Sequence, residues 1–325
     1  MPECIVFDSA ALLPTAWKHF AAQGPVRMFN PGLLRDGDGW ILAYRVVGAD
    51  TLRRLALCRL DREFRIVPGS PLPLTDLVRF PAGRSYDAPE AKTWFADPRL
   101  YRLTDRIFVY WNSGWHEPRN YQFLQELDPI RFTPLGAPRE LVRRGQRQKL
   151  EKNWTLFGDG SLHAIYSPNP QRVLAFSLAG EGDLECSDAH STPWQHDDYD
   201  QTHGGLRGGA PPQRLGDHYY SFCHSVHDAS DGFRYAPAVY RFSAKAPFAP
   251  TDGPHAALDL GHPFGARRVH PKLNPAVGEV VYPCGAAQDD GRWIVSFGIN
   301  DEHCALAVLS PADVLATLRP LTAQP

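Results

Sequence analysis

Short runs of β-branched and aromatic residues alternate with tight turns along most of this chain. The segment Gly37–Arg45, GDGWILAYR, is a turn signal followed by apolar residues that end on a polar side chain. Four further segments repeat this order of turn, apolar run and polar end: Thr104–Asn112, Gly158–Ser167, Gly216–Ser225 and Asp289–Asn300. Gly/Asp turns followed by such residues predict the second strands of β-hairpins.

Another short strand is expected before each of these segments. The expected first strands are Phe29–Leu34, Phe95–Leu103, Glu151–Phe157, Arg207–Leu215 and Val280–Gln288. The units recur at intervals of roughly 55–75 residues, which is enough for about four short strands in each. One such unit cannot bury both faces of its sheet, so the units must pack around a common axis.

The pattern therefore predicts an all-β fold, a five-bladed β-propeller. A β-sandwich is the alternative, but it would not explain why polar residues recur at the same place in every unit. Convincing helical periodicity is nearly absent, and Pro311–Pro320 is one candidate for a short helix. We expect residues 1–325 to form a single domain, with blades from about residue 28 onward and residues 1–27 closing or capping the propeller.

Composition and charge narrow the classes of function. Gly (27) and Pro (30) are abundant, which agrees with a fold of many turns. A formal net charge of -2 gives no overall field that would attract nucleic acid or an anionic membrane. We find neither an apolar run of membrane-spanning length nor a secretory signal, and the six cysteines form no CxxC pair. We therefore expect a cytoplasmic protein with reduced thiols, and we leave open its assembly into a homo-oligomer.

The polar ends of the strands should meet at one mouth of the propeller. If the first strand of each blade lines the central channel, its start lies beside the end of the next strand. The polar residues at these positions are Asn30, Arg45, Asp97, Arg99, Asn112, Lys152, Asn153, His224, Asn300 and Asp301. This ring predicts a site for a hydroxyl-rich ligand such as an oligosaccharide, although a wet channel alone would also favour polar residues.

The other clusters of polar residues in the sequence do not indicate a functional site. Gln195–Gly205 is crowded with His and Asp, but the spacing matches no zinc site and a solvated loop is favoured. Hairpin turns explain the aspartates at positions 36, 38, 159 and 231. We predict no metal site and find no cofactor motif.

Three segments together carry a resemblance to a known family: FNPGLLRDGDGWILAYRV, FADPRLYRLTDRIFVYW and VVYPCGAAQDDGRWIVSFGINDEHCALAVL. They resemble glycoside hydrolase family 130, five-bladed propeller enzymes that phosphorolyse or hydrolyse β-mannosides. They also resemble the related β-1,2-mannosyltransferases and phosphorylases of glycosyltransferase family 108. The resemblance implies no cofactor other than inorganic phosphate or a sugar phosphate as co-substrate.

The resemblance also implies roles for the ring residues. Asp97 falls on the catalytic aspartate, which in the family acts through a hydroxyl of the bound sugar. Lys152 and His224 fall on phosphate-contacting residues, while Arg45 and Asp301 fall on residues that hold the sugar. Asn30, Arg99 and Asn153 are further expected substrate-binding residues, and Arg99 could instead set the ionisation of Asp97. Trp115 and Trp154 are candidates for stacking on a sugar, although a core position is favoured for each.

The chain departs from the family pattern at several points. Ala96 replaces the acidic residue that precedes the family's catalytic aspartate, and the phosphate-binding arginine has no clear counterpart. Arg143, Arg144 and Arg147 lie nearby but equally fit a solvated surface. An inverting β-mannosidase therefore stays open as an alternative, with Glu151 as the nearest acid able to activate water. A catalytically silent sugar-binding propeller is the third interpretation.

Overall fold

The turn-and-strand segments form pairs of antiparallel strands. The computed structural model describes residues 2–114, 119–145, 148–158, 160–195, 197–230, 232–262 and 268–321. The inner pairs are β2 (Arg27–Asp36) with β3 (Gly39–Val47), β5 (Ala96–Leu103) with β6 (Arg106–Asn112), β9 (Thr155–Phe157) with β10 (Leu162–Ser167), β13 (Gly205–Arg207) and β14 (Gln213–Leu215) with β15 (His218–Ala229), and β18 (Val277–Asp289) with β19 (Arg292–Ile299).

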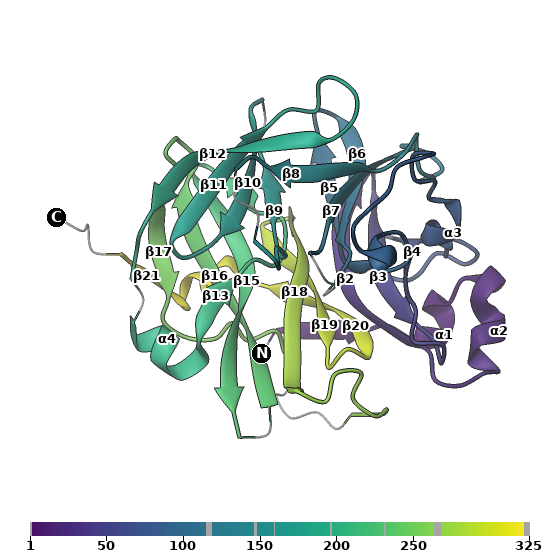
Figure 1. Ribbon diagram of the computed structural model, residues 1–325. Coiled ribbons are helices and arrows are strands. Elements are labelled where there is room, and N and C mark those ends of the chain that lie inside the picture. The colour runs from purple at the N-terminus through teal and green to yellow at the C-terminus, as the bar shows by residue number, and fades with distance from the viewer. Residues whose placement is uncertain are drawn as a thin grey trace.

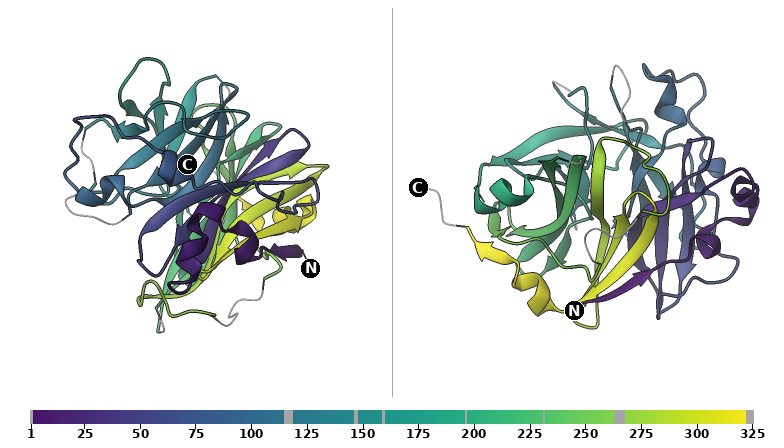
Figure 2. Two further views of the ribbon diagram at one scale, coloured as in Figure 1. Left: turned by 90° about the vertical axis from the view of Figure 1, so that its right-hand side faces the viewer. Right: turned by 90° about the horizontal axis from the view of Figure 1, so that it is seen from below.

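Outer strands extend each pair into a blade, numbered 1 to 5 in chain order. The outer strands are β4 (Arg53–Leu60), β7 (Gln122–Leu127) and β8 (Arg139–Arg143), β11 (Gln171–Phe176) and β12 (Leu184–Thr192), β16 (Gly232–Ser243) and β17 (Pro250–Pro254), and β20 (His303–Leu309). The N-terminal strand β1 (Glu3–Val6) pairs with β20 and completes blade 5. In blade 1, isolated bridges from Leu57 to Leu72 and from Leu60 to Ile66 take the place of a fourth strand. The predicted five-bladed β-propeller is confirmed (Figures 1 and 2).

Buried hydrophobic clusters lie between neighbouring blades all the way around the ring. Five clusters join blades 5 and 1, 1 and 2, 2 and 3, 3 and 4, and 4 and 5, and a sixth, smaller cluster lies along β18. Each of the five contains a buried tryptophan, in that order Trp40, Trp111, Trp154, Trp194 and Trp293. The core is therefore a set of five interfaces, and a single blade has no core of its own.

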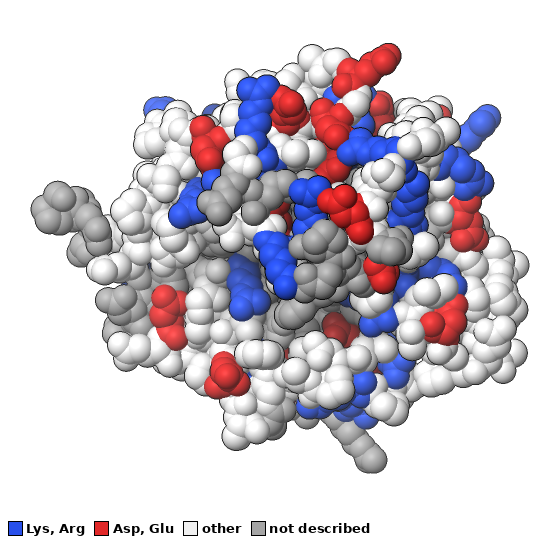
Figure 3. Space-filling model, viewed as in Figure 1, with Lys and Arg blue, Asp and Glu red and all other residues white. Residues whose placement is uncertain are grey.

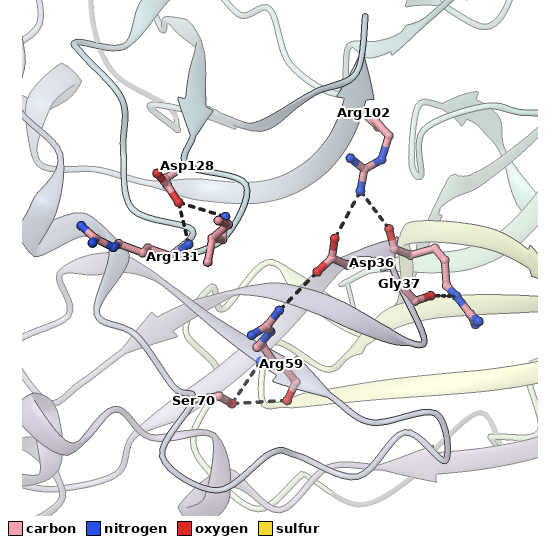
Figure 4. Close-up of polar contacts among 9 residues, drawn as sticks. Asp36, Gly37, Arg59, Ser70, Arg102, Asp128 and Arg131 are labelled. Carbon is pink, nitrogen blue, oxygen red and sulfur yellow. Dashed lines mark hydrogen bonds and ion pairs between the residues drawn. The ribbon is translucent and has the colours of Figure 1, made fainter.

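Two parallel strand pairs join neighbouring blades. β8 of blade 2 pairs with β12 of blade 3, and β16 of blade 4 pairs with β18 of blade 5. Polar contacts add a further link at the surface, where Asp36 accepts hydrogen bonds from Arg59 of blade 1 and Arg102 of blade 2 (Figure 4). Lys and Arg are interspersed with Asp and Glu over the face shown in Figure 3, so this face carries no extended patch of one sign.

Helices are few and short. They are α1 (Ser9–Leu12), α2 (Lys18–Ala21), α3 (Leu74–Leu77), α4 (Asp197–His203) and α5 (Pro311–Leu315), with 3₁₀ turns at Thr15–Trp17 and Pro89–Lys92. The helix predicted over Pro311–Pro320 is too long, because after α5 the strand β21 (Leu318–Pro320) pairs with β17. Within the described residues, no helix has the length and apolar character to cross a membrane.

Glycines let the inner strands approach one another around the axis. A Cβ atom added to Gly32 of β2 would lie 2.8 Å from the carbonyl oxygen of Pro98 in blade 2. One added to Gly285 of β18 would lie 2.8 Å from Leu33 Cβ in blade 1 and closer still to the Leu33 backbone nitrogen. The centre of the propeller is thus packed at backbone contact distance.

We predict that Gly285→Ala lowers the free energy of unfolding by about 1–3 kcal/mol, because the added methyl overpacks a site with backbone on its far side. Gly160→Ala is the matched control, since a Cβ there meets no atom within 4 Å. Urea unfolding of both variants measures the difference. Equal stability of the two variants would contradict the close packing of the inner strands.

Candidate active site

The five blades surround a pocket of about 380 Å³ at one mouth of the channel. Seven of the residues expected to form a site line it: Asn30, Arg45, Asp97, Lys152, Asn153, His224 and Asp301. Asn112 also lines the pocket, while Asn300 lies behind it and bonds to the backbone of Val280. The prediction that strand starts and strand ends meet at one mouth therefore agrees with the geometry.

A backbone feature shared by several blades turns these side chains into the pocket. Asn30, Asp97 and Asn153 have φ angles of 54°, 52° and 64°, and Asp301 has 58°. In β2 and β5 this residue coincides with a break in the strand register. Such left-handed positions interrupt the alternation of side chains along a strand, and among non-glycine residues Asn and Asp adopt them most readily.

Asp97 lies in a cationic environment. Asn30 Nδ2 donates a 2.8 Å hydrogen bond to Asp97 Oδ1, and Arg45 Nη1 lies 3.5 Å from the same oxygen. Burial acts to raise the pKa of Asp97, but Arg45, Arg99, the Asn30 hydrogen bond and Lys152 together lower it below the ordinary value. Asp97 is therefore ionised in the unliganded pocket at neutral pH.

Asp301 has the opposite electrostatic balance. Burial raises the pKa of its carboxyl, and the nearby Asp97 charge adds to this effect, although Arg45, Arg268 and Arg53 act against it. Both carboxylates thus interact with Arg45. Among the described residues that line the pocket, these two are the carboxylates.

A cluster of basic side chains forms the wall made by blades 3 and 4. Burial lowers the pKa of Lys152 to about 8, with Arg207 and Arg45 acting in the same direction against Asp97. Arg207 of β13 lies directly opposite His224 of β15 in the strand register. Burial, followed by the charges of Arg207, Lys152 and Arg99, holds the pKa of His224 well below its ordinary value. His224 is therefore a neutral imidazole between two cations.

Arg207 was not identified from the sequence. The arginines proposed there, Arg143 and Arg144, form ion pairs with Asp188 and Glu185 and do not line the pocket. Arg147 lies outside the described residues. Arg207 stands immediately before Gly208, at the start of the inner strand of blade 4, where the other blades have their mouth residues. This position is the sequence signal that could have identified it.

Arg99 lies below the pocket instead of in its wall, although it was expected to bind substrate. It is fully buried, its Nε donates to the Gly209 carbonyl and its Nη2 donates to Tyr282 Oη at 2.7 Å. Tyr282 Oη in turn donates to Asn153 Oδ1 at 2.9 Å. This one guanidinium links blade 2 to blades 4 and 5 directly, and to Asn153 beside blade 3 through the tyrosine.

The aromatic residues in the pocket differ from those expected. Trp154 is fully buried in the cluster between blades 2 and 3, and Trp115 lies outside the described residues. Among the described residues, the tryptophan that lines the pocket is Trp94, which was not predicted from the sequence. Tyr235 also lines it, with its ring stacked on His224 at a centroid distance of 5.4 Å.

The remaining candidates lie away from the pocket. Glu151 is buried, and its Oε1 accepts hydrogen bonds from the Gln148 amide at 3.0 Å and from Tyr166 Oη at 3.1 Å. It does not line the pocket, so it is not placed to activate water there. Within the described ranges, no three His, Cys, Asp or Glu side chains come together as a metal site would require.

No family model and no curated protein matches the sequence. A β-1,2-mannobiose phosphorylase from Listeria innocua, solved with β-1,2-mannobiose, matches with a TM-score of 0.61 at 13% identity, over 97% of this chain and 99% of its own. The chain shares the propeller fold of that enzyme.

Two further propellers show how widely this fold is used. A mannose phosphorylase from Leishmania mexicana, solved with phosphate ion, matches with a TM-score of 0.51 at 11% identity, over 91% of this chain and 87% of its own. An α-L-arabinofuranosidase from Lactobacillus brevis matches with a TM-score of 0.55 at 10% identity, over 87% and 90% of the two chains. The resemblance found in the sequence is therefore confirmed in fold, and the propeller itself does not decide the chemistry.

We predict that Arg99→Met raises the pKa of Asp97 in the unliganded protein, because one of the cations that stabilise its carboxylate is removed. A ¹³C titration of the Asp97 carboxyl by NMR measures the change. Arg241→Met is the control, since it removes a cation that pairs with Asp252 outside the pocket. An Asp97 pKa that is the same in the folded Arg99→Met variant as in wild type would contradict this electrostatic role.

Proposed function

We propose that this protein is a carbohydrate-active enzyme that transfers mannosyl units of β-mannosides with inversion. Phosphate is the acceptor in one direction, and mannose 1-phosphate is the donor in the other. The observation that carries the proposal is the pairing of Asp97 with a basic wall made by Lys152, Arg207 and His224. The relatives in fold that act on mannosides, one solved with β-1,2-mannobiose and one with phosphate ion, support the same assignment.

Charge balance supports an anionic co-substrate. The described residues lining the pocket include four cations, Arg45, Arg53, Lys152 and Arg207, against the carboxylates of Asp97 and Asp301. With His224 neutral, the lining has a net charge of about plus two, which a phosphate dianion would neutralise. Lys152 and Arg207 supply charge-assisted hydrogen bonds, and a ring N–H of neutral His224 can add a further donor.

Asp97 is the proposed acid. In phosphorolysis a phosphate oxygen attacks C1 of the terminal mannose while the bond from C1 to the glycosidic oxygen breaks on the opposite face. The leaving oxygen takes a proton that originates from Asp97, relayed through a sugar hydroxyl as in the resembled family. The products are α-mannose 1-phosphate and a glycan shorter by one unit. Arg45 and Asp301 hold the mannose by its hydroxyls.

Binding of the anion would prepare Asp97 for this role. In the unliganded pocket the surrounding cations keep Asp97 ionised, and an ionised carboxylate cannot donate a proton. A bound dianion compensates Lys152 and Arg207, so the pKa of Asp97 rises and its protonated form becomes available. This coupling favours transfer to phosphate over transfer to water, because water brings no negative charge.

Two other functions stay as alternatives. An inverting β-mannosidase needs a carboxylate base beside the attacking water, and Glu151 does not line the pocket. A sugar-binding propeller without activity could retain Arg45, Asp97 and Asp301. The use of mannose 1-phosphate also fits the cytoplasmic location expected from the sequence.

Incubation with α-mannose 1-phosphate and a panel of sugar acceptors separates the three functions. The proposed enzyme releases inorganic phosphate and lengthens the acceptor in equal amounts. A mannosidase instead releases free mannose from β-mannosides, at a rate that does not depend on phosphate. Binding of β-1,2-mannobiose without either reaction would identify a silent sugar-binding protein.

We predict that Asp97→Asn lowers kcat by roughly 10²–10⁴-fold, the range expected for loss of an acid catalyst. The amide keeps the shape of the side chain, so the thermal stability should change little. Asp36→Asn, at the last residue of β2, is the control and should leave kcat unchanged. Near wild-type turnover of Asp97→Asn would contradict the role of Asp97 as the acid catalyst.

The Lys152 pKa of about 8 predicts how anion binding depends on pH. Lys152 is charged below pH 8 and loses its proton as the pH rises, so the Kd for an anion should increase by up to about tenfold per pH unit above 8. Sulfate is a suitable probe because it stays a dianion across this range, and calorimetry between pH 6.5 and 9.5 measures the Kd. Lys152→Arg, which stays charged, should remove the increase. A parallel rise in both proteins would exclude Lys152 as the titrating group.

A further inference from the structure

Arg53 is a pocket residue that the proposed chemistry does not yet use. Its guanidinium carbon lies 4.0 Å from the centroid of the Trp94 ring, and both side chains line the pocket. Gly114 packs against the same indole, since a Cβ at Gly114 would lie only 2.8 Å from Trp94 Cε2 and closer to two other ring atoms. With its φ of 77°, Gly114 is suited to this close approach. Trp94 therefore contacts the Gly114 backbone as well as the Arg53 cation.

The carboxylate that acts on the charge of Arg53 is Asp301 of the pocket, which lies beyond ion-pair distance. Its Nη1 donates to the Thr51 carbonyl, while its Nε is buried without a hydrogen-bond partner. Arg53 makes no ion pair with any residue that the structure describes. Burial lowers its pKa to about 10, and Arg45 adds to the decrease. The Nη2 group makes no hydrogen bond to a described residue, so a ligand in the pocket can gain hydrogen bonds from it.

The position of Arg53 in the ring decides which ligand that is. Arg53 lies on β4 of blade 1 and Trp94 lies just before β5 of blade 2, so the pair marks the boundary between blades 1 and 2. The basic wall of Lys152, Arg207 and His224 belongs to blades 3 and 4, across the channel. In an inverting displacement the attacking and leaving groups occupy opposite faces of the reacting sugar. Phosphate at the basic wall therefore directs the leaving sugar toward Arg53.

We propose that Arg53, held by Trp94, binds the leaving sugar in phosphorolysis, which is the acceptor sugar in synthesis. This assignment rests on the proposed function. The planar guanidinium can donate to two neighbouring hydroxyls of that sugar. Because a phosphate dianion already neutralises the lining, the sugar bound here is an uncharged one. Asp97 follows Trp94 by three residues, which places the proposed acid on the same side as the leaving oxygen.

Kinetics in the direction of synthesis test this subsite, with mannose 1-phosphate as donor and mannose or β-1,2-mannobiose as acceptor. We expect Arg53→Ala to raise the KM for the acceptor by roughly 10–100-fold, the effect of losing hydrogen bonds to a charged donor. The KM for mannose 1-phosphate should change by less than about twofold, because the donor binds at the centre and at the basic wall. Trp94→Leu, which removes the ring beneath Arg53, should give the same acceptor-specific change in weaker form.

Arg54→Ala is the matched control. Arg54 is the next residue of β4, its guanidinium is also stacked on an aromatic ring, that of Phe20 at 4.4 Å, and it lies outside the pocket. It should change neither KM. An equal rise in the donor and acceptor KM of Arg53→Ala, or no rise in either, would overturn the assignment.

Calorimetry with sulfate separates failure of this subsite from failure of the proposed function. If wild type and Arg53→Ala bind sulfate equally and release phosphate in the assay, an unchanged acceptor KM contradicts the proposed subsite. The proposed function is then not affected. If the wild type neither binds sulfate nor uses mannose 1-phosphate, the proposed function fails and the subsite fails with it.

Discussion

A single buried guanidinium on the channel axis organises the site. Arg99 donates to the Gly209 carbonyl and to Tyr282, and Tyr282 carries the connection to Asn153. A buried cation is costly unless its donors are satisfied and its charge is compensated. Here a carbonyl and a phenol from two other blades accept from Nε and Nη2, while Nη1 has no partner among the described residues, and the nearby charge of Asp97 supplies compensation. The position of the pocket floor and the ionisation of the proposed acid therefore depend on the same side chain.

The two carboxylates of the pocket illustrate how environment separates identical groups. Asp97 and Asp301 are both half-buried at left-handed backbone positions and both interact with Arg45. Their pKa values nevertheless move in opposite directions. Asp97 accepts a hydrogen bond from Asn30, which lowers its pKa, whereas burial and the charge of Asp97 raise the pKa of Asp301. Divergence of this kind is common where two acids have different tasks.

The fold can be predicted from the sequence because each repeated unit contains a short pattern that indicates a β-hairpin. Each turn followed by apolar residues specifies a hairpin, and five repeats at similar spacing specify a ring. The mouth residues Asn30, Asp97 and Asn153 are also accessible from sequence, since they stand at the start of the inner strands. The predicted helix over Pro311–Pro320 is shortened because a tertiary contact, the pairing of β21 with β17, outweighs local preference.

Arg207, Arg53 and Trp94 line the pocket but were not predicted, because no local sequence pattern indicates that they lie there. Arg207 precedes a pair of glycines in an interrupted inner strand, and Arg53 lies on the third strand of its blade, where side chains are expected far from the axis. Trp94 belongs to the segment between blades. Conversely, the sequence pattern predicts Arg99 at the mouth of the channel, but in the structure its long side chain is fully buried and does not line the pocket.

The pairing of β1 with β20 bears on how the molecule is made. Glu3 lies opposite Val308, so β1 finds its partner only once the ribosome has synthesised the chain as far as β20. Each of the five cores also needs two blades, and the core between blades 5 and 1 needs both ends of the sequence. Contacts of such long range form slowly because the intervening chain must first be ordered. Until β20 has been synthesised, one flank of blade 1 and the free edge of β1 stay exposed, which gives newly made chains a period of sensitivity to aggregation.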